Sequence, residues 1–211
     1  MPVYELGLNV SPSNWRLFAM RKADPAFLAF SKKIFERDRY SCRFCGFKAK
    51  IYQEIINLDN NYRNNEQSNL ITACCFCTQC FFIESVGKQD YGGGTIIYLP
   101  TITQNDLNGL CHVLFCAMAN TVDYQNEAQN IYRTLTLRAK TVEKIFGDGM
   151  SDPALLGKML IDAYMENREE MSKKILRDLR LLPSRDKFIK HINDWSSDAF
   201  EEMLKSASKT E

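Results

Sequence analysis

The sequence predicts an α+β fold in which a zinc-binding first half, at residues 1–100, packs with an all-helical second half, at residues 101–211. Hydrophobic residues make up 45% of the chain and charged residues 25%, which allows a packed core and excludes wholesale disorder. Closely spaced cysteine pairs occur only in the first half, whereas helical apolar periodicity dominates after Pro100. No long flexible linker separates the halves, so we expect one continuous globular unit.

The N-terminal quarter is expected to contain two short strands and one helix. The segments 3–10 and 15–20 have the composition of short strands, with the turn SPSN between them. Asp24 followed by Pro25 is typical of a helix start, because aspartate caps the first turn and proline fits the first helical position. Apolar residues at helical spacing extend this helix to about Arg39.

The rest of the first half alternates loops with short elements. The segment SCRFCGF at 41–47 forms a knuckle-like turn, and 51–58 has the composition of a strand. A polar loop containing five asparagines follows at 59–69. We expect a short helix at 78–86, then a glycine-containing loop that leads into a buried strand within 91–100.

Helices are expected throughout the second half. The segment 101–120 is a capped helix that is apolar on much of its surface, and 124–146 is a second helix. Short breaks separate three more helical stretches at 152–165, 168–180 and 184–206, the last of which could break near Trp195.

Charge is distributed unevenly along the chain. The formal net charge is only +1, which argues against a protein that depends on bulk attraction to phosphates. Residues 16–50 nevertheless hold ten Lys and Arg against three Asp and Glu, whereas 51–131 hold two against eight. The basic stretch could face phosphates or an acidic partner, but a solvated helix face is the more ordinary explanation.

The sequence gives no sign of export. The N-terminus lacks the charged and apolar segments of a secretory signal, and no apolar run approaches the ~18 residues that span a bilayer. We therefore expect a cytoplasmic location, where cysteines stay reduced and two cysteine pairs about thirty residues apart are typical of a zinc site.

Eight cysteines supply the candidate ligands. Cys42 and Cys45 form one C-x2-C pair, and the second pair is either Cys74 with Cys77 or Cys77 with Cys80. A structural zinc site needs four such thiolates in a tetrahedron, and an iron–sulfur cluster is the chemical alternative.

The other cysteines have simpler explanations. Cys75 would be a buried thiol or an unused neighbour of the ligands. Cys111 and Cys116 lack metal-pair spacing and are expected to be core residues of a helix.

The stretch around these pairs resembles the zinc-containing HNH nuclease family, in its four-cysteine subgroup. The matching residues are Arg37-Asp38-Arg39-Tyr40, Cys42, Cys45, Gly46, Asn69-Leu70-Ile71-Thr72, Cys74 and Cys77. The resemblance covers about residues 34–86, assigns the second ligand pair to Cys74 and Cys77, and implies a ββα-metal, treble-clef-like fold.

The departures from this family bear on activity. The family's Asp-His doublet, which supplies the general base and a metal-binding carboxylate, falls on Gln53-Glu54. The two histidines of the chain, His112 and His191, lie in predicted helices far from the motif. The resemblance therefore implies a retained fold with no catalytic residues, used as a binding module rather than as an enzyme.

A second resemblance runs nearly end to end. It rests on SPSNWRL (11–17), the run 35–58, NLITACCFCTQCFFIESVG (69–87), YGGGTIIYLP (91–100), LNGLCHVLFCA (107–117), AQNIYR (128–133) and RLLPSRDKF (180–188). These segments resemble the IcmJ/DotN family of the Dot/Icm type IVB secretion system. The resemblance implies a scaffold subunit with one structural Zn²⁺ that binds the cytoplasmic tail of the coupling ATPase DotL at the inner membrane. DotM, IcmS and IcmW are the further implied members of this effector-recruiting complex.

Two other functions are compatible with the residues. The first is an HNH-type nuclease or nucleic-acid-binding protein, favoured by the basic stretch at 16–50. The second is a redox sensor in which Cys75 or Cys80 pairs with a zinc ligand. The sequence does not identify the partner surface: the aromatic residues Phe76, Phe81 and Phe82, the strand 95–99 and the helical half could each contribute to it or be core.

Overall fold

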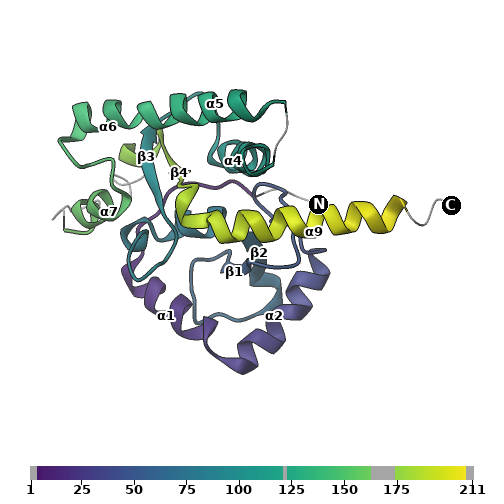
Figure 1. The fold of residues 1–211 in the computed structure, drawn as a ribbon. Coiled ribbons are helices and arrows are strands. Elements are labelled where there is room, and N and C mark those ends of the chain that lie inside the picture. The colour runs from purple at the N-terminus through teal and green to yellow at the C-terminus, as the bar shows by residue number, and fades with distance from the viewer. Residues whose placement is uncertain (1–3, 121–122, 163–173, 208–211) are drawn as a thin grey trace.

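The structure is a computed structural model that describes residues 4–120, 123–162 and 174–207, with side chains described up to residue 198. It is a mixed α/β fold in which helices surround two small antiparallel sheets. In Figure 1, the helices at 12–22 (α1) and 25–37 (α2) and the sheet formed by 53–57 and 70–74 make up the lower part. The helices at 104–119 (α4), 125–137 (α5) and 139–146 (α6) make up the upper part, and the helix at 189–207 (α9) crosses between the two.

The chain begins with an extended segment and two helices. α1 (Pro12–Lys22) lies where the sequence predicted a strand at 15–20, and that prediction was wrong. Phe18 and Arg21 are the buried residues of α1 and lie about one helical turn apart, a helical period that the six residues 15–20 are too few to reveal. Residues 4–10 form no strand either, because they make isolated hydrogen bonds to loops, such as Asn9 N–H to the Cys80 carbonyl, rather than a ladder.

α2 (Pro25–Arg37) starts where the sequence predicted. The Asp24 carboxylate accepts a hydrogen bond from the Ala26 N–H, so the aspartate caps the helix and Pro25 begins it. Ile34 on the inner face packs with Ile55 and Leu70 in a small separate core.

The first sheet is a hairpin that carries the second cysteine pair. β1 (Gln53–Asn57) and β2 (Leu70–Cys74) pair antiparallel, with Gln53 opposite Cys74. α3 (Cys75–Thr78) follows without a loop, and 3₁₀ turns occupy Gln79–Phe81 and Ile83–Ser85. The predicted helix at 78–86 is therefore replaced by an earlier α-helical turn and two 3₁₀ turns.

The second sheet joins distant parts of the chain. β3 (Gly94–Tyr98) pairs antiparallel with β4 (Leu179–Pro183), with Gly94 opposite Pro183. An all-helical second half was therefore a wrong prediction, as was the end of the helix at 168–180, whose residues 168–173 lie outside the described part. Leucines suit helices as well as strands, so only the pairing with β3 decides that Leu179, Leu181 and Leu182 form a strand.

The remaining helices follow the predicted order with shifted ends. Thr103 caps α4 (Gln104–Ala119), as predicted, whereas the predicted helix at 124–146 divides at Arg138. The others are α5 (Gln125–Leu137), α6 (Ala139–Phe146), α7 (Pro153–Asp162) and α9 (Ile189–Ala207), the last of which continues past Trp195 without a break.

One hydrophobic core draws on both predicted regions. Its buried residues run from Leu6 to Ile192 and include Phe76, Phe82 and Phe115. Helix α7 closes one side of it at Gly157, where an added Cβ would lie 2.6 Å from the Glu84 Cα. No side chain fits at that distance without a backbone shift.

The Gly157–Glu84 approach gives a test of the packing. Gly157→Ala should lower the free energy of unfolding by roughly 1–3 kcal/mol, because the methyl group meets backbone. Gly109→Ala is the matched control in another helix, since its nearest neighbour is the Cys45 carbonyl oxygen at 3.7 Å, an ordinary contact. It should raise stability by about 0.5–1 kcal/mol through helix propensity. Urea unfolding measures both, and equal stabilities would contradict the packing of α7.

Candidate metal centre

The first cysteine pair lies on a tight knuckle after α2. Gly46 N–H donates to the Cys42 carbonyl at 3.0 Å, and Gly46 has φ +78°, in the left-handed region that glycine adopts without strain. Asp38 fastens the knuckle to the first sheet, since its Oδ2 accepts from the Thr72 N–H at 2.9 Å and its Oδ1 pairs with Arg43. These contacts hold the knuckle against β2 without involving a cysteine side chain.

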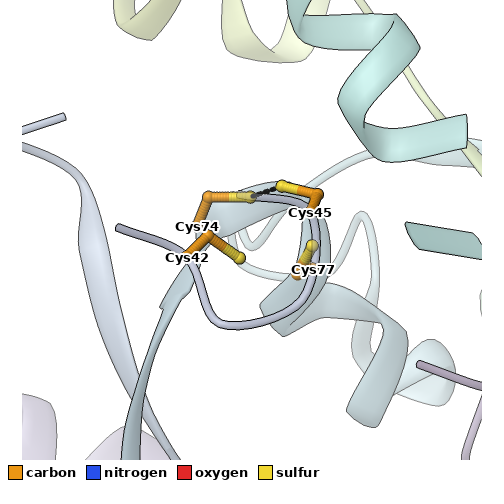
Figure 2. Close-up of side chains that lie close together, drawn as sticks. All are labelled: Cys42, Cys45, Cys74 and Cys77. Carbon is orange, nitrogen blue, oxygen red and sulfur yellow. Dashed lines mark hydrogen bonds between the residues drawn. The ribbon is translucent and has the colours of Figure 1, made fainter. Parts of the chain in front are cut away.

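The second pair comes from the end of β2 and the turn that follows. Cys74 is the last residue of β2, and Cys77 lies in α3. Figure 2 shows their side chains pointing toward those of Cys42 and Cys45. The four Sγ atoms lie within 4.8 Å of one another, and those of Cys45 and Cys74 are 3.6 Å apart.

This arrangement fits a tetrahedral metal ion. Zinc–sulfur bonds of ~2.3 Å place the sulfurs of a tetrahedron ~3.8 Å apart, a value between the 3.6 Å separation of Cys45 and Cys74 and the 4.8 Å limit of the cluster. Three of the cysteines are buried and Cys45 is partly buried, so the site is closed, as structural sites are. The four thiols that the structure brings together are therefore chemically able to hold one ion.

The cluster needs a cation to ionise fully. Burial raises the pKa of Cys74 and Cys77 well above the ordinary value of a thiol. Burial acts in the same direction on Cys42, but hydrogen bonds from the other three thiols outweigh it and lower the pKa of Cys42. Four thiols sharing one buried space cannot all lose their protons without a positive charge, so binding of a metal ion here would be coupled to folding.

The neighbouring cysteines stay outside this group. The Cys80 thiol donates to the Phe76 carbonyl at 3.4 Å, and burial raises its pKa. Burial likewise raises the pKa of Cys75, and that of Cys111 to about 12. Cys116 was expected in the core but is exposed. Cys80 is buried and Cys75 is partly buried, and a thiol that stays protonated is a poor nucleophile, which does not favour redox sensing by either residue.

Two polar side chains of α4 reach the cluster, and the sequence did not predict them. The Asn108 Nδ2 donates to the Cys77 Sγ at 3.2 Å, and the His112 Nε2 lies 3.3 Å from the Cys74 Sγ. The His112 ring stacks on Phe47 and Phe76, and burial lowers its pKa to about 3. Their spacing of four residues, on one face of an otherwise apolar helix, was the available signal.

The doublet Gln53-Glu54 lies on β1. The Glu54 carboxylate forms an ion pair with Lys22, and the Gln53 side chain donates to the Tyr40 carbonyl at 3.3 Å. His191, distant in sequence, packs its ring 4.0 Å from that of Tyr52. Burial lowers the pKa of His191, and the Glu54 charge opposes that shift.

An open pocket of about 650 Å³ lies beside the metal centre. Its lining comes from the end of α2, the knuckle, α4 and α9, and includes Phe47, His112 and Trp195. Phe76 and Phe82, considered above for a partner surface, are instead completely buried, and Phe81 is partly buried.

In the described part of the chain, no helix combines the length and apolar character needed to cross a membrane.

The fold and site define a mixed α/β protein built around a buried four-cysteine cluster that can hold a metal ion. No protein-family profile matches the chain. The chain is 56% identical over 199 residues to the type 4 apparatus protein DotN of Legionella pneumophila, covering 94% of this chain and 92% of that protein. It therefore belongs to the DotN family, which confirms the resemblance that runs nearly end to end along the sequence.

Replacing single cysteines tests the ligand set. Cys42→Ser and Cys74→Ser should give metal-free, insoluble or unfolded protein, because metal binding at such sites is linked to about 10 kcal/mol or more of folding free energy. Cys116→Ser, at an exposed position, should leave solubility and metal content unchanged. Metal content by mass spectrometry and soluble yield are the measurements. Equal solubility and metal content in all three variants would contradict the assignment.

Proposed function

We propose that this protein is a non-enzymatic scaffold subunit of a Dot/Icm type IV secretion apparatus. The observation that carries the proposal is the 56% identity, over nearly the full length of both chains, to a protein named as a type 4 apparatus protein. An identity this high over nearly the full length of both chains supports a shared fold and a shared role in the apparatus. The proposed location is the cytoplasmic face of the inner membrane, reached through partners.

The metal of the proposal is one structural zinc ion per chain. Four cysteines in two C-x2-C pairs, converging at a closed site, are the donor set typical of structural zinc. The knuckle, the β1–β2 hairpin and α3 follow one another as in a ββα-metal unit, which supports an HNH-like origin of this region. In this proposal Cys42, Cys45, Cys74 and Cys77 hold the ion, and its chemistry is to fix the fold.

The absence of catalysis is part of the proposal. Gln53 occupies the strand beside Glu54 where the HNH resemblance implies Asp-His, and an amide cannot act as a general base. The Glu54 carboxylate is already paired with the Lys22 ammonium, which competes with any divalent cation. The Glu54 carboxylate, paired with Lys22 and without a general base beside it, is not expected to support hydrolysis.

The proposed partner is the cytoplasmic tail of the coupling ATPase DotL, in a complex with DotM, IcmS and IcmW. Purified protein mixed with that tail should form a stable complex at micromolar concentration, measured as a mass increase over 24.3 kDa by light scattering. Protein from which the metal has been removed is the control, and should bind less because the fold depends on the ion. A folded, zinc-loaded protein that binds neither the tail alone nor the tail with the other subunits would contradict the proposal.

Nuclease activity is the second candidate, and one observation favours it. The fold brings His191 into contact with Tyr52, two residues before Glu54, so a histidine does lie near the doublet. We expect no cleavage of plasmid DNA with Mg²⁺, Mn²⁺ or Ni²⁺. Metal-dependent cleavage that disappears in both Glu54→Ala and His191→Ala would overturn the scaffold proposal.

A further inference from the structure

Two N–H groups of α4 point at the sulfur atoms of the cluster. Asn108 and His112 lie four residues apart and so on the same face of the helix. Their nitrogens are 3.2 Å from the Cys77 Sγ and 3.3 Å from the Cys74 Sγ, well inside the range for hydrogen bonds to sulfur. Each side chain serves a different ligand, both from the second cysteine pair.

The orientation of Asn108 is fixed by a chain of hydrogen bonds that begins on β4. The Leu181 backbone N–H can only donate, and it donates to the Gln104 Oε1 at 2.9 Å. The Gln104 Nε2 therefore faces the Asn108 Oδ1, at 2.9 Å, and the Leu181 carbonyl, also at 2.9 Å. This leaves the Asn108 Nδ2 toward sulfur, so the direction of the amide does not depend on how its oxygen and nitrogen were assigned.

The donor role of His112 follows from the acceptor it faces. A metal-bound thiolate has no proton to give, so the nitrogen against the Cys74 Sγ must carry the hydrogen. Phe47 and Phe76 hold the ring on its two faces, at centroid distances of 3.6 Å and 4.2 Å. The Nδ1 atom is buried and has no hydrogen-bond partner among the described residues. The polar contact that the structure shows for this ring is therefore that of Nε2 with the Cys74 Sγ.

These donors face a charge that needs dispersal. Four thiolates around one divalent cation carry a net charge of −2, and here they lie in the core. Hydrogen bonds to thiolate stabilise that charge where water cannot, and outer partners of metal ligands also hold the ligands in place. We propose that Asn108 and His112 are positioning residues of the metal centre, which donate N–H···S hydrogen bonds to Cys77 and Cys74 and slow metal loss. This rests on the metal site of the proposed function.

Paired substitutions test this role. Asn108→Leu and His112→Phe keep size and, for His112, ring stacking, but remove the N–H. Each should release zinc to excess chelator roughly 10- to 100-fold faster than the unchanged protein. Asn120→Leu is the control on α4's C-terminal end, where the amide donates to the Cys116 carbonyl, and His191→Phe is the control for the other histidine. Both controls should release zinc at the unchanged rate, and equal rates in all four folded variants would overturn the proposal.

A spectroscopic measurement separates this role from general destabilisation. In the cobalt-substituted protein, loss of an N–H···S bond raises the energy of the sulfur electrons, so the sulfur-to-cobalt charge-transfer bands should move to longer wavelength in Asn108→Leu and His112→Phe. Looser packing elsewhere would leave these bands in place, so unchanged bands in the two variants would overturn the proposal.

The unchanged protein supplies the decisive measurement should the variants fail to fold. Loaded with cadmium-113, it should show NMR coupling from the metal to the Asn108 side-chain amide protons and to the His112 Nε2 proton. Cadmium bound by four thiolates without those couplings would overturn this inference and leave the metal site standing. Failure of the folded protein to bind cadmium or zinc would instead overturn the metal site of the proposed function, and this inference with it.

Discussion

The structure depends on the convergence of four cysteine thiols from two parts of the chain. Cys42 and Cys45 lie on a knuckle after α2. Cys74 is the last residue of β2, and Cys77 lies in α3. Burial raises the pKa of Cys74 and Cys77, so binding of a cation that ionises these thiols would be linked to closure of the intervening hairpin. In the proposed function, a metal ion held by this cluster would contribute folding free energy that so small a sheet could not supply alone.

The second half of the chain completes this centre rather than standing apart from it. The β3–β4 pair joins residues about 85 positions apart, and its Leu181 backbone orients Gln104 and through it Asn108. His112 enters the same site between Phe47 and Phe76. The cluster is therefore surrounded by side chains from both sequence regions, and a disturbance of α4 should reach the ligands directly.

The position that would carry chemistry in an HNH nuclease is occupied by groups that hold the fold. Glu54 pairs with Lys22 of α1, and Gln53 bonds to the backbone of the knuckle. Such pairing uses the carboxylate for structure, which agrees with a scaffold role in a secretion apparatus. The pocket beside the cluster is lined in part by Phe47 of the knuckle, so the loop that carries Cys42 and Cys45 also shapes this surface.

The sequence alone determined the features that depend on local spacing: the two C-x2-C pairs, the capped start of α2 at Asp24, the strand within 51–58 and the capped start of α4. The resemblance chose Cys74 and Cys77 over Cys80, and the geometry brings that same set together. Only the tertiary structure decided that 15–20 is helical, that Leu179–Pro183 is a strand, and that Asn108 and His112 face sulfur. The reason is physical. Residue spacing determines helix caps and cysteine pairs, because these involve neighbours along the chain. Strand pairing and the contacts of Asn108 and His112 with sulfur, which join residues 31 and 38 positions apart, form only when the core packs.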